Sequence, residues 1–158
     1  MLVNCIDLDE KVDKESAYKA DNGKYYSSKE AYEKIKLENK RKKWATNELI
    51  ILLGFEEYKI IPTILFKVIN SYHEVGYEAL CKTIVAKENV IKYAIANNSF
   101  KNDYAKIKYV EAVINNNIND IIRESKTKVS KNDNIVADDT KLNNPKQKQK
   151  DISQFLEV

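Results

Sequence analysis

Apolar residues recur three and four positions apart through most of the stretch from residue 62 to residue 122. One such set follows Pro62 and comprises Ile64, Leu65, Val68, Ile69 and Tyr72. This spacing puts the residues on one face of a helix, whereas a half-buried strand alternates apolar and polar residues. The chain has only 3 Gly and 2 Pro, which are too few turn residues for an extensive sheet. We therefore predict an all-α fold, a compact bundle of four or five short helices.

Capping and breaking residues mark where the first helices begin and end. Ser27 and Glu30 fit a capping box, so a helix can run from residue 28 to about residue 43. Thr46 can cap a separate short helix, and Gly54 is a suitable C-terminal stop for it. These signals predict two helices in succession before residue 55.

Later signals divide the rest of the bundle. Pro62 suits the first turn of a helix, and Gly76 breaks that helix. Two further apolar stripes, at residues 77–85 and 90–95, precede a loop signal at residues 97–99. Asp103 can cap a last helix that ends near residue 123. Residues 44–124 are enough to bury one modest core.

The composition divides the chain into four parts. Residues 1–26 are acidic and read as a weakly structured N-terminal arm, with a turn signal at residues 21–23. Residues 27–124 form the helical domain. Residues 125–148 are rich in lysine and hold no aromatic residue, which predicts a disordered basic linker. Residues 149–158 are a C-terminal docking peptide.

The sequence offers little for catalysis. It has one histidine, His73, and its two cysteines, Cys5 and Cys81, lack metal-ligand spacing. The three glycines are scattered, so there is no phosphate-binding loop. We expect no enzyme activity, no metal and no cofactor. The chain lacks a signal peptide and a membrane span, so we expect a cytoplasmic protein without membrane partners.

A basic stretch closes the first expected helix. The stretch comprises Lys34, Lys36, Lys40, Arg41, Lys42 and Lys43 and is closed by Trp44, although the net charge of the whole chain is only +3. Lysine and arginine that meet phosphates release counterions and gain affinity. The stretch is therefore a candidate contact for the DNA backbone. The alternative is a solvated helix end whose positive charge suits the helix dipole.

The carboxyl end carries an apolar group without a partner of its own. Ile152 and Phe155 are three residues apart, so a single 3₁₀ turn would place both side chains on the same side. Leu156 would enlarge the apolar surface that they form. Gln149 has donor and acceptor atoms that can anchor such a peptide. The residues either dock on another protein or fold back onto the helical core.

This end resembles the PIP box, the peptide by which replication and repair proteins bind sliding clamps. That pattern has Gln, an aliphatic residue three positions later, and two aromatics three positions after that. Gln149, Ile152 and Phe155 match it, while Leu156 stands where the second aromatic is usual. The resemblance covers residues 149–156 and implies a sliding clamp as the partner.

Residues 77–122 also resemble the helical domain of DnaD-type replication-initiation proteins. Those proteins carry Tyr, an aliphatic residue four later, and Trp four later again. Tyr109 and Val113 match, and Asn117 replaces the Trp. The resemblance implies DNA binding, with Lys106 and Lys108 near the exposed face.

These features predict a non-enzymatic accessory factor of DNA replication or clamp-coupled transcription. The expected partners are a sliding clamp or another replisome protein, and DNA. The alternative is a protein–protein interaction module, such as a phage-encoded inhibitor, that uses a surface around Trp44, Phe55, Tyr58 and Phe66. The Lys-, Asn- and Ile-rich composition fits an AT-rich genome and suggests a phage, virus or mobile element.

Overall fold

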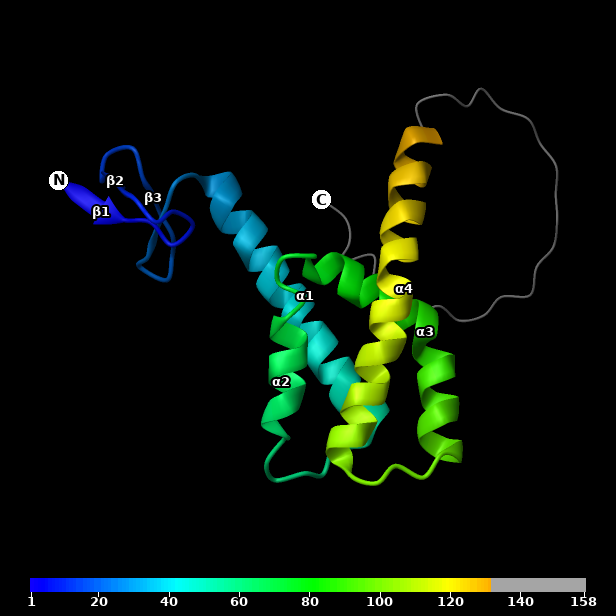
Figure 1. The fold of residues 1–158 in the computed structure, drawn as a ribbon. Helices are drawn as coiled ribbons and strands as arrows, with labels where there is room; N and C mark the ends of the chain where they lie inside the picture. The colour runs from blue at the N-terminus through cyan, green and yellow to red at the C-terminus, as the bar shows by residue number, and fades with distance from the viewer. Residues whose placement is uncertain (132–158) are drawn as a thin grey trace. The chain divides into compact units, whose positions relative to one another are not determined.

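The structure is a computed structural model that describes residues 1–131, with side chains described through residue 128. The chain divides into two compact units, one from Met1 to Lys43 and one that begins at Trp44. The described elements are β1 (Leu2–Asn4), β2 (Lys11–Asp13), β3 (Tyr18–Lys19), β4 (Tyr25–Tyr26), α1 (Lys29–Leu53), α2 (Thr63–Asn70), α3 (Tyr77–Asn97) and α4 (Asp103–Lys131) (Figure 1).

The N-terminal unit contains two antiparallel hairpins, which the all-α prediction missed. Strands β1 and β2 pair with Val3 opposite Val12, and β3 and β4 pair with Tyr18 opposite Tyr26. The Ile6 amide donates to the Tyr25 carbonyl at 2.9 Å and joins the hairpins. With strands of two or three residues, the alternating pattern was too short to recognise in the sequence. The fold is therefore mostly helical, but not all-α.

The second hairpin turns where the sequence indicates a turn. Gly23 has a φ of +78°, and its amide donates to the Ala20 carbonyl at 2.9 Å. The Asn22 side-chain oxygen accepts from the Lys24 amide at 3.0 Å. Asn followed by Gly is a strong short-range hairpin signal because the turn needs positive φ. The turn at residues 21–23 is confirmed.

Helix α1 is one continuous helix, whereas two were expected. Its N-terminal cap is Ser28, whose hydroxyl accepts from the Ala31 amide at 3.1 Å, one residue later than the predicted cap. The predicted cap Thr46 lies inside the helix. Because Lys40 to Lys43 are good helix formers, nothing in the sequence forces a break before Thr46.

Gly54 ends α1 as predicted. It has a φ of +72°, which an L side chain adopts only at a cost. Its amide donates to Ile51 at 3.0 Å, and the Phe55 amide reaches back to Ile50 at 2.9 Å. These two bonds make a Schellman motif, which satisfies carbonyls at the helix end. Phe55 follows in the buried core, with no exposed surface.

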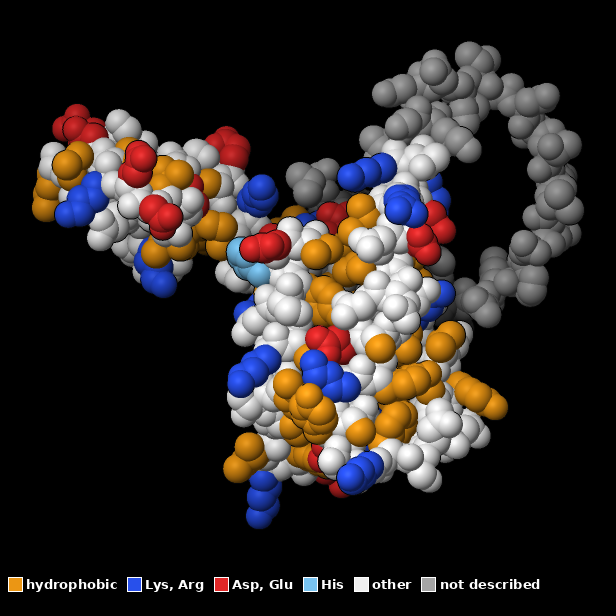
Figure 2. All heavy atoms as spheres, in the orientation of Figure 1, with side chains coloured by type: hydrophobic (Ala, Val, Ile, Leu, Met, Phe, Trp, Pro, Cys, Tyr) orange, Lys and Arg blue, Asp and Glu red, His pale blue; other side chains and the backbone are white. Residues whose placement is uncertain are grey.

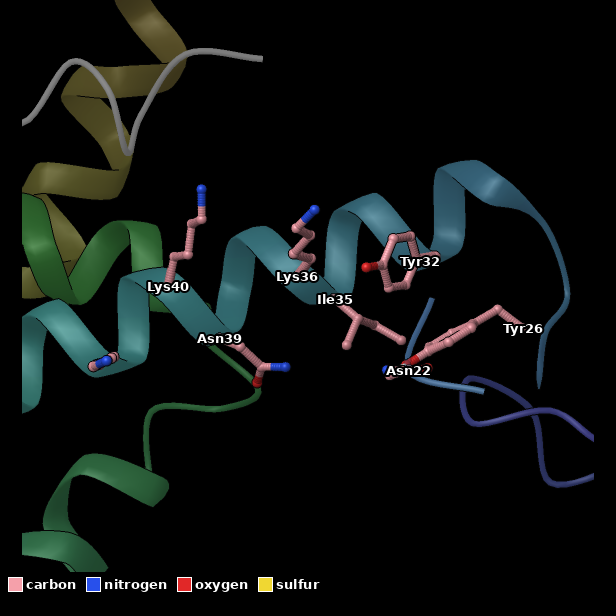
Figure 3. Close-up of a pocket in the computed structure, with 8 residues that line it drawn as sticks. Asn22, Tyr26, Tyr32, Ile35, Lys36, Asn39 and Lys40 are labelled. Atoms are coloured by element: carbon pink, nitrogen blue, oxygen red, sulfur yellow. The ribbon is translucent and has the colours of Figure 1, made fainter. Parts of the chain in front are cut away.

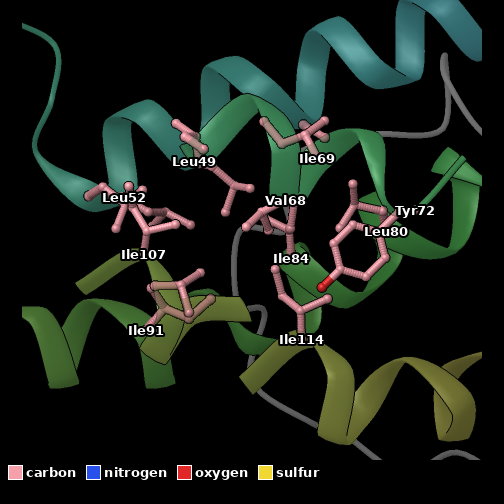
Figure 4. Packing of buried hydrophobic residues seen from close by; sticks show 14 of the residues in the cluster. Leu49, Leu52, Val68, Ile69, Tyr72, Leu80, Ile84, Ile91, Ile107 and Ile114 are labelled. Atoms are coloured by element: carbon pink, nitrogen blue, oxygen red, sulfur yellow. The ribbon is translucent and has the colours of Figure 1, made fainter. Parts of the chain in front are cut away.

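The second unit packs residues 44–53 of α1 with α2, α3 and α4 around one hydrophobic core (Figure 4). Leu49 and Leu52 come from α1, and the other helices contribute side chains at the spacing that the sequence predicts. The core residues on α2 to α4 include Leu65, Val68, Ile69, Leu80, Ile84, Ile91, Ile107, Val110, Ile114 and Ile118. The core is therefore built from the predicted apolar stripes.

Two helices are longer than expected. The stripes at residues 77–85 and 90–95 belong to a single helix, α3, which starts directly after Gly76. Helix α4 continues past Arg123 to Lys131, so its last residues extend into the range predicted as linker. Its cap is Asn102, which accepts from the Ala105 amide at 2.9 Å, and not Asp103. Sequence signals locate helices better than their ends.

Candidate nucleic-acid interface

The lysines of the first 15 residues of α1 do not all lie on one side of the helix. At about 100° per residue, Lys36, Lys40 and Lys43 fall within roughly 60° of one another. Lys34 falls on the opposite side of the same helix. All four side chains are exposed. Lys36, Lys40 and Lys43 therefore form one basic face, which Lys29 extends toward the start of α1. This face takes in only part of the basic stretch from Lys34 to Lys43.

This basic face lines an open cavity of about 330 Å³ in the N-terminal unit (Figure 3). Figure 3 shows Lys36 and Lys40 projecting from the same side of α1. The lining residues are Asn22, Tyr26, Tyr32, Ile35, Lys36, Asn39, Lys40 and Lys43. They include three lysines and two tyrosines but no carboxylate, so the cavity favours an anionic ligand.

Three tyrosine rings cluster at one end of the cavity, and two of them, Tyr26 and Tyr32, line it. Tyr32 on α1 lies edge-on to Tyr26 with ring centroids 5.1 Å apart, and 5.6 Å from Tyr18. The Lys36 ammonium lies 5.4 Å from the centre of the Tyr32 ring, within cation–π range. Asn22 donates to the Tyr26 hydroxyl at 3.3 Å. These contacts fix the Tyr32 ring while leaving it partly exposed.

A carboxylate fixes the segment that leads into α1. The Asp7 carboxylate accepts the backbone amide of Ser27 at 2.8 Å and also its hydroxyl. Partial burial works to raise the pKa of Asp7, but the two hydrogen bonds from Ser27 outweigh it, so the pKa lies below its ordinary value. Asp7 is therefore held as an anion that joins the first hairpin to the start of the helix.

The predicted basic run is split by the structure. Lys40 and Lys43 line the cavity. Lys42 is half-buried and does not line it. The Arg41 side chain is only 7% exposed and pairs with the Glu38 carboxylate at 2.7 Å. Arg41 therefore does not belong to the exposed basic surface, because its position on the helix turns it to the other side.

Lys106 and Lys108 are both engaged within the helical unit. The Lys106 ammonium lies 3.4 Å from the Leu53 carbonyl and 5.5 Å from the centre of the Phe55 ring. It thus interacts with the C-terminal end of α1, where positive charge is favourable. Lys108 forms an ion pair with Glu111 at 2.6 Å, and the hydrogen bond to this carboxylate raises its pKa. Neither lysine lies on the basic face of α1.

The residues of the second resemblance lie on α4. Tyr109 packs against Phe100 with ring centroids 5.5 Å apart, and Val113 is packed against the core. Asn117, which stands in the Trp position, donates to the Val113 carbonyl of its own helix at 2.7 Å. Tyr109 and Val113 therefore pack within the helical unit.

The predicted docking peptide, Gln149, Ile152, Phe155 and Leu156, lies outside the described residues. So does the predicted linker beyond residue 131. The aromatic surface of the alternative hypothesis is partly buried, since Phe55 lies in the core whereas Tyr58 and Phe66 are both 42% exposed. Trp44 packs against the core.

Several residues of the cavity were not predicted from the sequence. They are Asn22, Tyr26, Tyr32, Ile35 and Asn39. The three- and four-residue spacing of Tyr32, Lys36, Asn39, Lys40 and Lys43 could have indicated a shared helix face. The hairpin residues Asn22 and Tyr26 carried no comparable signal, because only folding brings them beside α1.

Up to residue 131, no group of three His, Cys, Asp or Glu side chains is arranged to hold a metal ion. None of the helices described here has the length and apolar content of a membrane span. His73 is exposed, and its ring lies 6.3 Å from the ring of Tyr77.

Comparisons of the chain with protein families, with curated proteins and with solved structures find no match.

Proposed function

We propose that the chain is a non-enzymatic accessory factor of DNA replication or clamp-coupled transcription. In this proposal the basic face of α1 contacts DNA, and the C-terminal peptide binds a sliding clamp. The observation that carries the DNA contact is the cavity lined by Lys36, Lys40 and Lys43 beside Tyr32. Within the described residues, none of these three lysines forms an ion pair with a carboxylate.

The charge arrangement supports a weak, salt-dependent contact. Three lysines can neutralise about three phosphates, and each released counterion adds affinity at low salt. Three contacts give only modest affinity at physiological salt. The factor therefore needs a second contact to stay near DNA.

The C-terminal peptide would supply that second contact. Gln149, Ile152, Phe155 and Leu156 resemble a clamp-binding peptide, and lysine-rich sequence precedes them. A tether of this kind acts through effective concentration, since a bound tail holds the rest of the chain near the DNA on which the clamp sits. Two weak contacts then act together, with no strong DNA site required.

Calorimetry with purified clamps tests the tail. The full chain and a chain lacking residues 149–158 would each be titrated into a bacterial and a eukaryotic-type sliding clamp. We expect binding by the full chain to one of them, loss of binding on truncation, and an unchanged helical signal in circular dichroism. The double variant Ile152→Ala/Phe155→Ala should reproduce the loss, whereas the control Ser153→Ala/Glu157→Ala should bind normally. Equal binding by the truncated chain, or binding to neither clamp, would refute the clamp proposal.

A protein–protein interaction module is the second candidate. Several large apolar side chains are exposed on the helical unit, and Figure 2 shows hydrophobic side chains gathered on its visible face. They include Ile51, Ile60, Phe66, Val75, Val90, Tyr93 and Tyr104. Salt distinguishes the candidates, since retention on DNA should fall steeply as salt rises for a DNA-binding factor. A module that binds only protein should show no retention on DNA even at low salt.

A further inference from the structure

We propose that the cavity on α1 is a binding site for single-stranded DNA, in which Tyr32 stacks on one base while Lys36, Lys40 and Lys43 follow the backbone. This assignment deepens the proposed function and rests on its DNA contact. It adds the form of DNA and the roles of Tyr32 and Asn39.

Neighbouring rings already hold the Tyr32 ring in place, so it can stack on a base without first becoming ordered. It is partly exposed at the cavity and is held by Tyr18 and Tyr26, with ring centroids 5.6 and 5.1 Å away. A ring that is already fixed loses little conformational freedom when a ligand binds. Stacking of one base on an aromatic side chain contributes about 1–3 kcal/mol and accepts any base, because every base has a π-face.

The lysines extend from the ring along the helix. From Lys36 to Lys43 the helix rises about 10 Å. The three ammonium groups are thus spread along the helix, so each can meet a different phosphate of one strand. A base on Tyr32 therefore places the adjoining backbone along the line of lysines. The three ammonium groups and the aromatic ring together form a basic groove with a stacking platform.

Asn39 lies between the lysines and is the polar group best placed to meet a base edge. Its exposed amide carries both donors and an acceptor. The Asn22 amide is less available, because it donates to Tyr26 and accepts from Lys24. One amide gives little sequence discrimination. We therefore expect a preference for single strands with weak dependence on sequence.

The cavity favours a single strand over a duplex for a geometric reason. A ring at the end of a hollow reaches the face of a base only where that base is not stacked between its neighbours. In a duplex every base is stacked, and only the phosphates would meet the lysines. The volume of about 330 Å³ lies at the lower end of the range for small-ligand sites, which suits one nucleotide unit.

Fluorescence anisotropy with the full-length chain and no clamp tests the assignment. The probes are a labelled 20-nucleotide oligo(dT), a duplex of the same length, and heparin as a polyanion without bases. We expect the tightest binding to oligo(dT). Lys40→Ala should weaken it and reduce the salt slope by about 0.7, the value for one phosphate contact on a single strand. Lys34→Ala is the matched control, because it removes the same charge from the opposite side of α1.

Variants of Tyr32 test the stacking contact. Tyr32→Phe keeps the ring and should bind normally. Tyr32→Leu should weaken binding to oligo(dT) by roughly 5- to 150-fold and leave duplex binding unchanged. If circular dichroism shows that Tyr32→Leu loses structure, the comparison of Lys40→Ala with Lys34→Ala decides the location of the site, and the comparison of oligo(dT) with duplex decides its preference.

Four results would overturn the assignment. They are equal affinity for oligo(dT), duplex and heparin, equal losses for Lys40→Ala and Lys34→Ala, unchanged binding by a folded Tyr32→Leu chain, and thymidine monophosphate competing as strongly as the oligonucleotide. The last result would identify a free nucleotide as the ligand. Because no clamp is present, failure of the tail proposal would leave all of these measurements unaffected.

Discussion

Ser27 donates both its backbone amide and its hydroxyl to the carboxylate of Asp7, 20 residues earlier in the chain. The next residue, Ser28, caps α1. The pair therefore joins the first hairpin to the start of the helix whose basic face forms the candidate site. Each hydrogen bond to an ionised carboxylate is about twice as strong as a hydrogen bond between neutral groups.

Replacing Asp7 should destabilise the N-terminal unit in a pH-dependent way. The folded-state pKa of Asp7 lies below its unfolded value near 3.9, so its stabilisation is fully present above that value and is lost as the pH falls through the folded pKa. We expect Asp7→Asn to cost about 1–3 kcal/mol at pH 7 and progressively less below about pH 4.

Hydrogen exchange of the Ile6 amide, which bonds to Tyr25, measures this loss. Asp9→Asn is the control, since Asp9 is exposed and two residues away. A difference between wild type and Asp7→Asn that stays constant down to pH 2 would contradict the prediction.

Gly54→Ala should destabilise the helical unit by about 1 kcal/mol. The φ of +72° is unfavourable for alanine, while a methyl group there would meet open space, so backbone strain is the only cost. Gly54→Asn should lose less, because asparagine tolerates this conformation better. Urea unfolding measures both variants. Equal losses for alanine and asparagine would show that strain is not the cause.

Ile84→Ala should cost about 2–5 kcal/mol, because Ile84 is fully buried at the centre of the core on α3. Ile60→Ala makes the same chemical change at a side chain that is 84% exposed, and it should shift stability by less than about 0.5 kcal/mol. Thermal unfolding compares the two. Similar losses would mean that Ile60 is covered by something beyond the described residues.

Tyr72→Phe should cost about 0.5–1.5 kcal/mol. The Tyr72 hydroxyl donates to the Asn115 side-chain oxygen at 2.7 Å, and burial with a contribution from Glu111 raises the pKa of Tyr72 well above its ordinary value. Asn115 is exposed and can turn to water when the hydroxyl is removed, so the cost stays modest. Guanidinium unfolding measures it, and a loss above about 3 kcal/mol would contradict this account.

Lys106→Ala and Lys108→Ala should leave DNA retention close to that of the wild type, whereas Lys40→Ala weakens it. Lys106 is held at the Leu53 carbonyl and Lys108 at Glu111, so both are engaged away from the basic face. Retention on a DNA column at low salt compares the three variants. A larger loss for Lys106→Ala or Lys108→Ala than for Lys40→Ala would instead locate the DNA contact on α4.

The sequence determined much of the helical unit by itself. Gly54 ends α1 as expected, because its positive φ is costly for other residues. Gly76 directly precedes α3, whereas it was expected to end the preceding helix, which stops earlier, at Asn70. The apolar stripes of α2, α3 and α4 form the core because a three- and four-residue period admits only one buried face. Both features can be predicted from the sequence because their causes, the backbone φ of a glycine and the period of a helix, involve only neighbouring residues.

Tertiary structure decided the hairpins and the candidate site. Strands of two or three residues carry too little pattern to predict, and the Asp7–Ser27 pair joins positions that no local rule relates. The same holds for the cavity, where Tyr26 from a hairpin meets Tyr32 from α1. The sequence indicates one basic stretch from Lys34 to Lys43, but helix geometry turns Lys34 and Arg41 away from the face that holds Lys36, Lys40 and Lys43. A helix distributes consecutive residues around its axis, so the helix period groups the lysines, whereas only the folded chain brings Asn22 and Tyr26 beside them.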